Sequence, residues 1–252
     1  MKQKVIYYKD ELNDEFSKAK INPIKIDKNY KYEHKSFWNL CSYLLQNFVS
    51  MPIKVLYAKI KFKHKIIGKE KFKNSKKQGY FIYVNHTQEF VDTFLPSLAN
   101  YPKRNFFIVN PENISMKGLK HLVELLGAVP VPGNIDATKT FKNIIEKHIK
   151  KNHSITIYPE AHIWPYYTKI RPFKSVSFKY PVELNAPIYT ITNTYRLQNK
   201  KVQIVSYIDG PFFAKENIHP KQAQNQLRDI AYNTMYERSK NSSYEHIKYK
   251  KL

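Results

Sequence analysis

The pattern of hydrophobic and polar positions divides the chain near residue 77. Beyond it, short runs rich in β-branched and aromatic residues alternate with stretches in which apolar residues recur at helical spacing. The predicted strands are 79–85, 105–110, 127–132, 154–159, 187–195 and 202–208, and the predicted helices are 90–99, 115–126, 137–151, 177–184 and 221–240. This alternation predicts one α/β domain over 77–252, with a mostly parallel central sheet flanked by helices.

A different pattern precedes this domain. Residues 36–53 carry no charge, and their apolar side chains recur at helical spacing until Pro52, which is expected to bend or end the helix. Interspersed polar residues make the stretch unsuited to span a bilayer, which needs about 20 mostly apolar residues. Basic and apolar residues then alternate, so 36–76 is predicted to be an amphipathic membrane-interface segment. The alternative is an ordinary amphipathic helix and strand packed on the core.

The first part of the chain, residues 1–35, is polar and has no sustained period. It is predicted to be a loosely docked or partly disordered lead-in without a chemical role. The N-terminal residues contain no apolar signal-peptide core, and the single cysteine, Cys41, excludes an intramolecular disulfide and a cysteine-based zinc site. These features predict an intracellular protein.

The net charge adds a class of partner to this picture. The chain has 252 residues, 42% of them hydrophobic, which is enough for a substantial core. Its 43 Lys and Arg against 20 Asp and Glu give a formal charge of +23. Such an excess predicts binding to a polyanion, and nucleic acid and anionic lipid are the two candidates. The alternative is a compositional skew spread over the whole chain.

Candidate catalytic groups follow two of the predicted strands. Asn85 and His86 come directly after the first strand of the domain, Asp92 lies in the next helix, and Glu160 follows the fourth strand. Reactive groups in open α/β sheets gather at the carboxyl ends of the strands. A histidine beside a carboxylate can act as a general base, because the carboxylate sets its tautomer and stabilises the imidazolium. A purely structural His–Asp pair is the alternative.

Three blocks in this order, Asn-His at 85–86, Tyr-Pro-Glu at 158–160 and Ala-Pro-Ile-Tyr at 186–189, resemble the lysophosphatidic acid acyltransferase (1-acyl-glycerol-3-phosphate O-acyltransferase) family. The resemblance spans about residues 79–195. It implies a glycerol-3-phosphate acyltransferase-like fold in which His86 is the base, Asp92 orients it and Glu160 contacts the acceptor.

The resemblance also implies the reaction and its partners. In that family the activated hydroxyl attacks the acyl-thioester carbonyl directly, without a covalent acyl-enzyme, a metal or a cofactor. The implied donor is acyl-CoA or acyl carrier protein, and the implied acceptor is a lysophospholipid, with 1-acylglycerol-3-phosphate leading, or a glycerol phosphate. The protein is then expected to act peripherally, at the cytoplasmic face of an anionic membrane.

Two departures from the family pattern leave alternatives open. Five residues separate His86 from Asp92 where the family has four, so Glu89 is an alternative orienting carboxylate. The block after Glu160 also lacks the arginine that is the natural ligand of an acceptor phosphate. Arg171, a short loop downstream, is the candidate to bind the acceptor phosphate in place of that arginine. The alternative is that Arg171 belongs to a solvated basic loop without a binding role.

Two other interpretations compete with an active enzyme. The charge and the basic stretches interleaved with aromatic residues also suit a nucleic-acid-binding protein, although no recognisable nucleic-acid module is present. Affinity would then fall steeply with salt, and His86 would be dispensable. The other interpretation is a catalytically idle family member that only docks on membranes.

Overall fold

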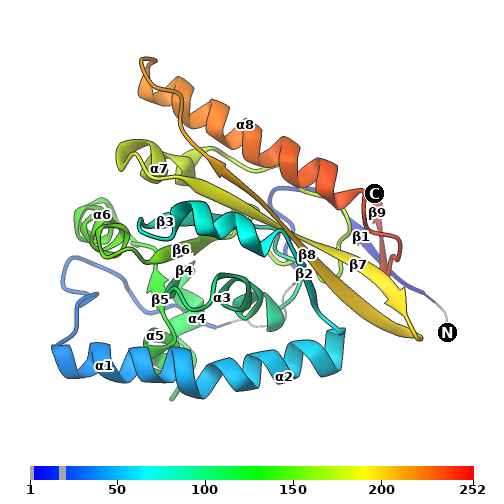
Figure 1. Ribbon diagram of the computed structural model, residues 1–252, viewed down its shortest axis with the longest axis horizontal. Helices are drawn as coiled ribbons and strands as arrows, with labels where there is room; N and C mark the ends of the chain where they lie inside the picture. Colours follow the sequence, from blue (N-terminus) through cyan, green and yellow to red (C-terminus); the bar gives the residue numbers. More distant parts are fainter. Residues whose placement is uncertain (1–2, 17–20) are drawn as a thin grey trace.

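A seven-stranded sheet forms the centre of the protein (Figure 1). The computed structural model describes residues 3–16 and 21–252. The strands, in the order β2-β8-β7-β3-β6-β4-β5, are β2 (Lys65–Ile67), β8 (Lys201–Phe212), β7 (Ile188–Gln198), β3 (Tyr80–Val84), β6 (Ser154–Ile157), β4 (Asn105–Val109) and β5 (Ala128–Pro130). All neighbours are parallel except β7 and β8. The predicted fold class is therefore confirmed, and the six predicted strands correspond to β3 through β8.

Helices cover both faces of the sheet (Figure 1). α6 (Ile135–Lys150), α7 (Lys179–Glu183) and α8 (Pro220–Ser239) pack on one face, and α3 (Leu95–Asn100) and part of the N-terminal helix pack on the other. The side chains of β3 alternate between these two cores and are all buried, as expected for a central parallel strand. The shorter elements are α4 (Pro111–Ile114), α5 (Lys120–Leu125) and three 3₁₀ turns at Lys69–Ser75, Val91–Thr93 and Val176–Phe178.

The predicted N-terminal helix is longer than its sequence pattern indicated. α1 (Ser36–Leu44), a π-helical turn (Leu45–Val49) and α2 (Ser50–Phe62) follow one another without a break. The expectation that Pro52 ends the helix is wrong. Proline is tolerated there because it lies in the first turn of α2, directly after the wider π turn, where its missing N–H costs little.

The long helix buries several polar side chains and exposes many apolar ones, although α2 also buries the apolar Met51, Ala58 and Phe62. Ser42, Gln46 and Lys54 are buried against the domain, and Ser42 Oγ donates a 2.7 Å hydrogen bond to the carbonyl of Leu125. Apolar side chains face outward instead: Phe37, Leu40, Tyr43, Leu44, Phe48, Val49, Ile53, Val55, Leu56 and Ile60. None of the helices in the described part of the chain is both long and apolar enough to cross a bilayer.

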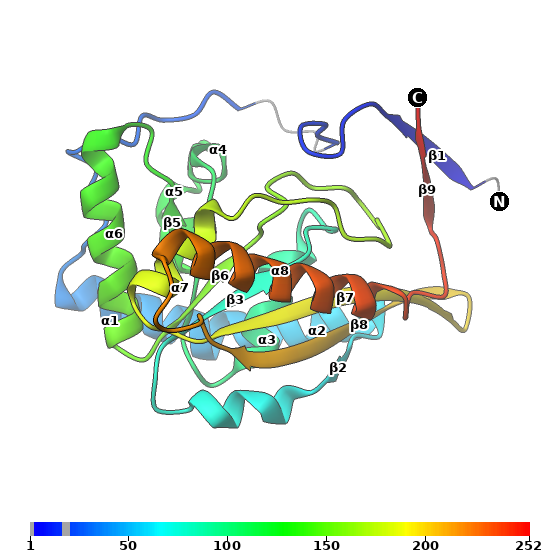
Figure 2. The same cartoon turned by 90° about the horizontal axis from the view of Figure 1, so that it is seen from above.

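A second, two-stranded sheet joins the two ends of the chain. β1 (Lys4–Tyr8) pairs in parallel with β9 (Ile247–Lys251), and Figure 2 shows the two strands side by side, away from the main sheet. The sequence predicted neither strand, because the pairing joins segments far apart in the chain and neither has a buried face with a clear period. Residues 1–2 and 17–20 of the predicted lead-in lie outside the described residues.

Candidate active site

The His86 side chain lies just past the carboxyl end of β3. Its Nδ1 donates a 2.9 Å hydrogen bond to Asp92 Oδ2, which leaves Nε2 with a free lone pair. The same carboxylate oxygen accepts the backbone N–H groups of Thr87 at 2.8 Å and Gln88 at 2.9 Å. Asp92 is fully buried, whereas 16% of the His86 side chain is exposed. The arrangement holds an imidazole in one orientation with its second nitrogen available to a substrate.

The turn between these two residues absorbs the extra residue of the His-to-Asp spacing. Residues 85–90 are not helical, and Asp92 lies in the 3₁₀ turn Val91–Thr93 that follows. Because the additional residue is taken up before any helix begins, the carboxylate of Asp92 still reaches the ring. Glu89, the alternative carboxylate, is exposed. The geometry therefore selects Asp92 over Glu89 as the partner of His86.

Tyr158 is a further member of the site. Its ring stacks on the His86 imidazole with centroids 4.3 Å apart and planes 26° apart, and its hydroxyl donates to the carbonyl of Asp92 at 2.5 Å. Burial, reinforced by the nearby Asp92 charge, raises the pKa of Tyr158 well above its usual value, so the phenol stays protonated and keeps donating. The only sequence signal for this role was its place beside Pro159 and Glu160 at the end of β6.

Two polar residues fasten the His86 turn to the neighbouring strand β7. The Asn85 side chain accepts the N–H of Asn193 at 2.8 Å and donates to its carbonyl at 3.0 Å. The Thr87 hydroxyl accepts a 2.7 Å hydrogen bond from the Tyr195 hydroxyl. These side-chain bonds replace ladder bonds beyond the end of β3, so the turn keeps a defined position.

Glu160 connects the His86 turn to the loop that follows β6. Its Oε2 accepts the backbone N–H of His86 at 2.9 Å, and its Oε1 accepts the backbone N–H of Arg171 at 2.8 Å. Burial raises the pKa of Glu160, whereas the Arg171 charge and the two backbone donors oppose that rise. Both oxygens of this buried carboxylate are thus engaged within the protein.

The structure brings the two predicted acceptor-binding residues, Arg171 and Glu160, together, but it encloses Arg171. Its Nη2 lies 3.5 Å from Glu160 Oε2 and also donates to the carbonyl of His162, and its Nη1 donates to the carbonyl of Glu11 at 3.3 Å. Only 1% of the residue is exposed. A contact from Arg171 to an acceptor phosphate would require the guanidinium to leave these partners.

The two ends of the chain pack over the loop between Glu160 and Arg171. Trp164, at the centre of that loop, is fully buried, and its Nε1 donates to the carbonyl of Asp14 at 2.8 Å. Its ring contacts the rings of Tyr8, Phe16 and Tyr249 at centroid distances of 4.8, 5.1 and 5.1 Å. The lead-in, for which the sequence predicted no chemical role, thus holds a loop of the candidate site.

The described residues contain no group of three or more His, Cys, Asp or Glu side chains that could hold a metal ion. The His86 site consists instead of one histidine, its carboxylate partner and the groups that position them. Such a site is equipped to take a proton from a hydroxyl.

Comparison with known proteins places this site within a recognised family. A family model described as "Acyltransferase" matches residues 63–194, just over half of the chain, and this range contains His86, Asp92, Glu160 and Arg171. The structure also resembles the crystal structure of the 1-acyl-sn-glycerophosphate (LPA) acyltransferase PlsC from Thermotoga maritima. The TM-score is 0.55 at 14% identity, over 82% of this chain and 89% of that chain, so the likeness is one of fold. No curated protein matches the chain.

Proposed function

We propose, from the premise that this chain belongs to the acyltransferase family, that it moves a fatty acyl group from an acyl thioester to a hydroxyl of a lysophospholipid or a glycerol phosphate. The favoured acceptor is 1-acylglycerol-3-phosphate, and the donor is acyl-CoA or acyl carrier protein. The observation that carries the proposal is the 2.9 Å hydrogen bond from His86 to Asp92 inside the matched region. Family membership also favours an enzyme over the nucleic-acid-binding interpretation.

The chemistry follows from the free Nε2 of His86. As the acceptor oxygen attacks the thioester carbonyl, Nε2 takes the hydroxyl proton, and a tetrahedral intermediate forms. Its collapse breaks the carbon–sulfur bond, and the leaving thiolate takes the proton from the imidazolium. The Asp92 carboxylate, bonded to Nδ1, stabilises the positive ring between these two steps. General-base catalysis of this kind is worth about 10²–10⁴-fold in rate.

We assign Glu160 and Arg171 to positioning. Glu160 bonds the backbone of His86, and Arg171 neutralises Glu160 while tying it to the following loop. The exposed Lys169 and Lys174 flank Arg171 in the same loop and offer positive charge to an acceptor phosphate without breaking a buried ion pair. In this proposal Glu160 and Arg171 hold the base and the loop beside it. This positioning role replaces the acceptor-binding role that was predicted for them.

We further propose that the outward apolar face of α1 and α2 docks on an anionic membrane. Leu56 and Ile60, one turn apart, are 61% and 62% exposed, while the polar Ser42 and Gln46 face the domain. Exposing apolar side chains to water is costly, and burying them in the interface recovers that free energy. The formal charge of +23 adds attraction to anionic headgroups. On this proposal the protein works peripherally, at the cytoplasmic face.

Acyl transfer by the full chain on anionic vesicles tests the catalytic proposal. Labelled palmitoyl-CoA and 1-acylglycerol-3-phosphate are supplied, and the His86→Ala variant is compared with His121→Ala, which removes an exposed histidine outside the site. We expect His86→Ala to lose about 10²-fold or more in rate and His121→Ala to keep wild-type activity, with circular dichroism confirming both folds. Full activity in His86→Ala would sink the proposed mechanism.

A wild-type protein without transfer under these conditions would be retried with acyl carrier protein and other lysolipids. Failure with all donors and acceptors would favour the idle, membrane-docking interpretation.

Vesicle co-sedimentation tests the docking face separately. The Leu56→Asp/Ile60→Asp double variant is compared with Leu197→Asp, which changes an exposed apolar residue at the end of β7. Each buried apolar side chain contributes about 1.5–3 kcal/mol, so we expect the double variant to bind at least about 10²-fold more weakly. Equal weakening in both variants would contradict a docking role for this helix.

A further inference from the structure

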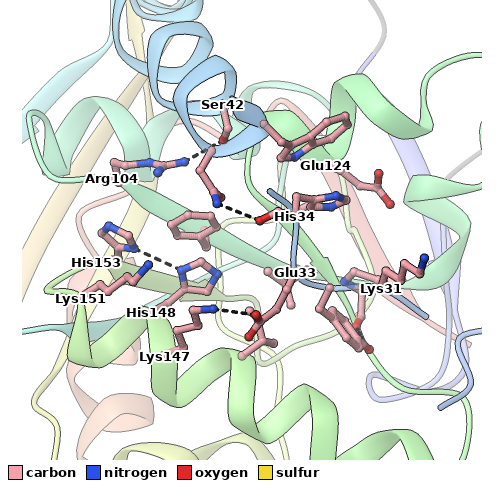
Figure 3. A pocket seen from close by; sticks show the side chains of 18 of the residues that line it. Lys31, Glu33, His34, Ser42, Arg104, Glu124, Lys147, His148, Lys151 and His153 are labelled. Atoms are coloured by element: carbon pink, nitrogen blue, oxygen red, sulfur yellow. Dashed lines mark hydrogen bonds and ion pairs between the residues drawn. The ribbon is translucent and has the colours of Figure 1, made fainter. Parts of the chain in front are cut away.

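A pocket lies at the opposite end of the parallel strands from the His86 site. It is a cavity of about 310 Å³ between α1, α6, the edge of the sheet at β4 and β5, and the segment that precedes α1 (Figure 3). Arg104 and His153, which line it, directly precede β4 and β6, whereas His86 and Glu160 follow the carboxyl ends of β3 and β6. The two sites therefore lie at opposite ends of parallel strands. The volume falls at the lower end of the range for small-molecule pockets.

Positive charge outweighs negative charge in this pocket. Lys31, Arg104, Lys147 and Lys151 line it, against the two carboxylates of Glu33 and Glu124. Figure 3 shows Arg104, Lys147 and Lys151 gathered on one side of the cavity. The carboxylates are already engaged, because one pairs with Lys147 at 2.8 Å and the other accepts the hydroxyl of a tyrosine at 2.5 Å. The excess cations thus have little compensation from within the pocket.

Arg104 is the strongest candidate ligand for an anion in this pocket. Its guanidinium is half-buried, lies 5.0 Å from the centre of the Phe106 ring and donates to Ser42 Oγ at 2.7 Å. Within residues 3–16 and 21–252, no carboxylate forms an ion pair with Arg104 or with Lys151. The partners of Arg104 are neutral groups, among them Gln46 Oε1 at 3.5 Å, so the charge of the guanidinium remains available to an anion. A guanidinium also matches the oxygens of a phosphate in a bidentate fork.

Two neighbouring histidines add one neutral donor to the same wall. His148 and His153 lie with their Nδ1 atoms 3.2 Å apart, and the His148 ring stacks on Phe106 at 3.7 Å. Burial, with nearby positive charges such as that of Arg104, lowers the pKa of His148 to about 3 and that of His153 to about 4. Both rings are therefore neutral near pH 7. Because one Nδ1 donates to the other, the accepting ring carries its proton on Nε2, where it can donate to a bound anion.

We propose that this pocket is a binding site for a phosphomonoester, separate from the catalytic site, with Arg104 and Lys151 as its principal ligands and Lys147 beside them. The cavity is larger than a phosphate group needs, and Tyr32, Trp38 and Ile144 give it apolar walls for the remainder of the ligand. A soluble phosphorylated metabolite and the headgroup of a phosphatidic-acid-type lipid share this chemistry. The test below separates them.

The two tryptophans of the chain provide a reporter for each site. Trp38 lines the pocket, whereas Trp164 lies in the loop beside Glu160. In the full chain labelled with ¹⁵N-tryptophan, the two indole N–H signals are assigned with Trp38→Phe, and inorganic phosphate, glycerol 3-phosphate and dihexanoyl phosphatidic acid are then titrated. Binding at the pocket shifts the Trp38 signal, and binding of an acceptor at the catalytic loop shifts the Trp164 signal. Failure of one proposal is thus distinguishable from failure of the other.

We expect a saturable Trp38 shift that weakens by about tenfold or more in Arg104→Gln and by about threefold in Lys151→Gln, since charge-assisted bonds are worth more when half-buried than when exposed. Lys139→Gln, which removes the same charge from an exposed position of α6 outside the pocket, should bind as wild type does. Because Lys151 is exposed, its variant stays informative if Arg104→Gln fails to fold.

The relative affinities identify the source of the ligand. Tighter binding of glycerol 3-phosphate points to a soluble metabolite, and tighter binding of dihexanoyl phosphatidic acid points to a lipid headgroup. No saturable Trp38 shift with any probe, or equal affinity in Lys151→Gln, Lys139→Gln and the wild type, would overturn the proposal.

Discussion

Replacing Asp92 by Asn removes the negative charge from the proposed catalytic dyad while keeping its shape. Asp92 Oδ2 accepts three hydrogen bonds, from the His86 ring and from the N–H groups of Thr87 and Gln88, and an amide oxygen in the same place accepts all three. The amide nitrogen then replaces Oδ1, which is buried and has no hydrogen-bond partner among the described residues. An unpaired buried donor costs about 1–3 kcal/mol of stability, so the variant should fold with a lowered melting temperature.

The effect on the rate is larger and has a separate cause. In the wild type, the imidazolium formed during proton transfer has a carboxylate 2.9 Å from its Nδ1. In Asp92→Asn it faces a neutral amide. Loss of effective general-base catalysis reduces the rate by about 10²–10⁴-fold. This range corresponds to about 3–5 kcal/mol in the activation free energy, because each tenfold change in rate is about 1.4 kcal/mol.

The assay is steady-state acyl transfer, followed through release of free thiol, with Glu89→Gln as the matched control. Glu89 carries the same carboxylate three residues from His86, but it is exposed. We expect Asp92→Asn to lose kcat by the range above and Glu89→Gln to stay close to wild type. The opposite ranking of the two variants would refute the assignment of the dyad, and wild-type kcat in both would refute a catalytic role for either carboxylate.

Three further predictions concern stability. Gly79→Ala places a Cβ 2.2 Å from the carbonyl oxygen of Ile149, so we expect at least about 2 kcal/mol of destabilisation in urea unfolding; an unchanged midpoint would contradict this. Burial lowers the pKa of His64 to about 4, so this residue binds fewer protons in the folded protein than in the unfolded chain. Its own contribution to stability should therefore fall by about 3 kcal/mol as the pH drops from about 6.5 to about 4, in addition to the contributions of His148 and His153. Unfolding at both pH values should show a smaller drop in stability for His64→Gln, whose longer amide can reach the position of Nε2 beside Ser206, and an identical drop would argue against His64 as the cause. Trp164→Ala should lower the free energy of unfolding by about 3–5 kcal/mol, because the ring is fully buried. It should also lower kcat, because the ring holds the loop after Glu160, which bonds the backbone of His86. Unchanged kcat in a folded variant would show that this loop has no part in catalysis.

Local sequence pattern was sufficient for most of the central sheet. β3 through β8 were predicted because a buried strand needs a run of β-branched and aromatic residues wherever it lies, and such runs are visible without knowing the neighbours. His86 was located for a similar reason, since a group placed directly after a strand ends up at the carboxyl edge of a parallel sheet, whereas the roles of His86 and Asp92 came from the family resemblance. The reactive edge could therefore be located before any contact was known.

The helix before the domain shows what the local sequence pattern cannot predict. Its apolar spacing was read correctly as helical, but the spacing does not say whether the apolar face packs on the domain or faces outward. The structure places Ser42 and Gln46 inside, where they bond the end of α5, and leaves the apolar face exposed. Docking of the helix depends on these hydrogen bonds and on the packing of Met51, Ala58 and Phe62 against distant segments, neither of which the spacing predicts.

By itself the sequence determined the α/β class, the strand runs and the identity of the candidate base, because each depends on residues close together in the chain. Only the tertiary structure decided that Asp92, and not Glu89, reaches His86, because the choice depends on how the turn before Val91–Thr93 is folded. It also decided that Arg171 is enclosed against Glu160, and that β1 and β9 pack over the loop between them. These outcomes rest on contacts between segments far apart in sequence, whose hydrogen bonds and burial exist only once the chain has folded.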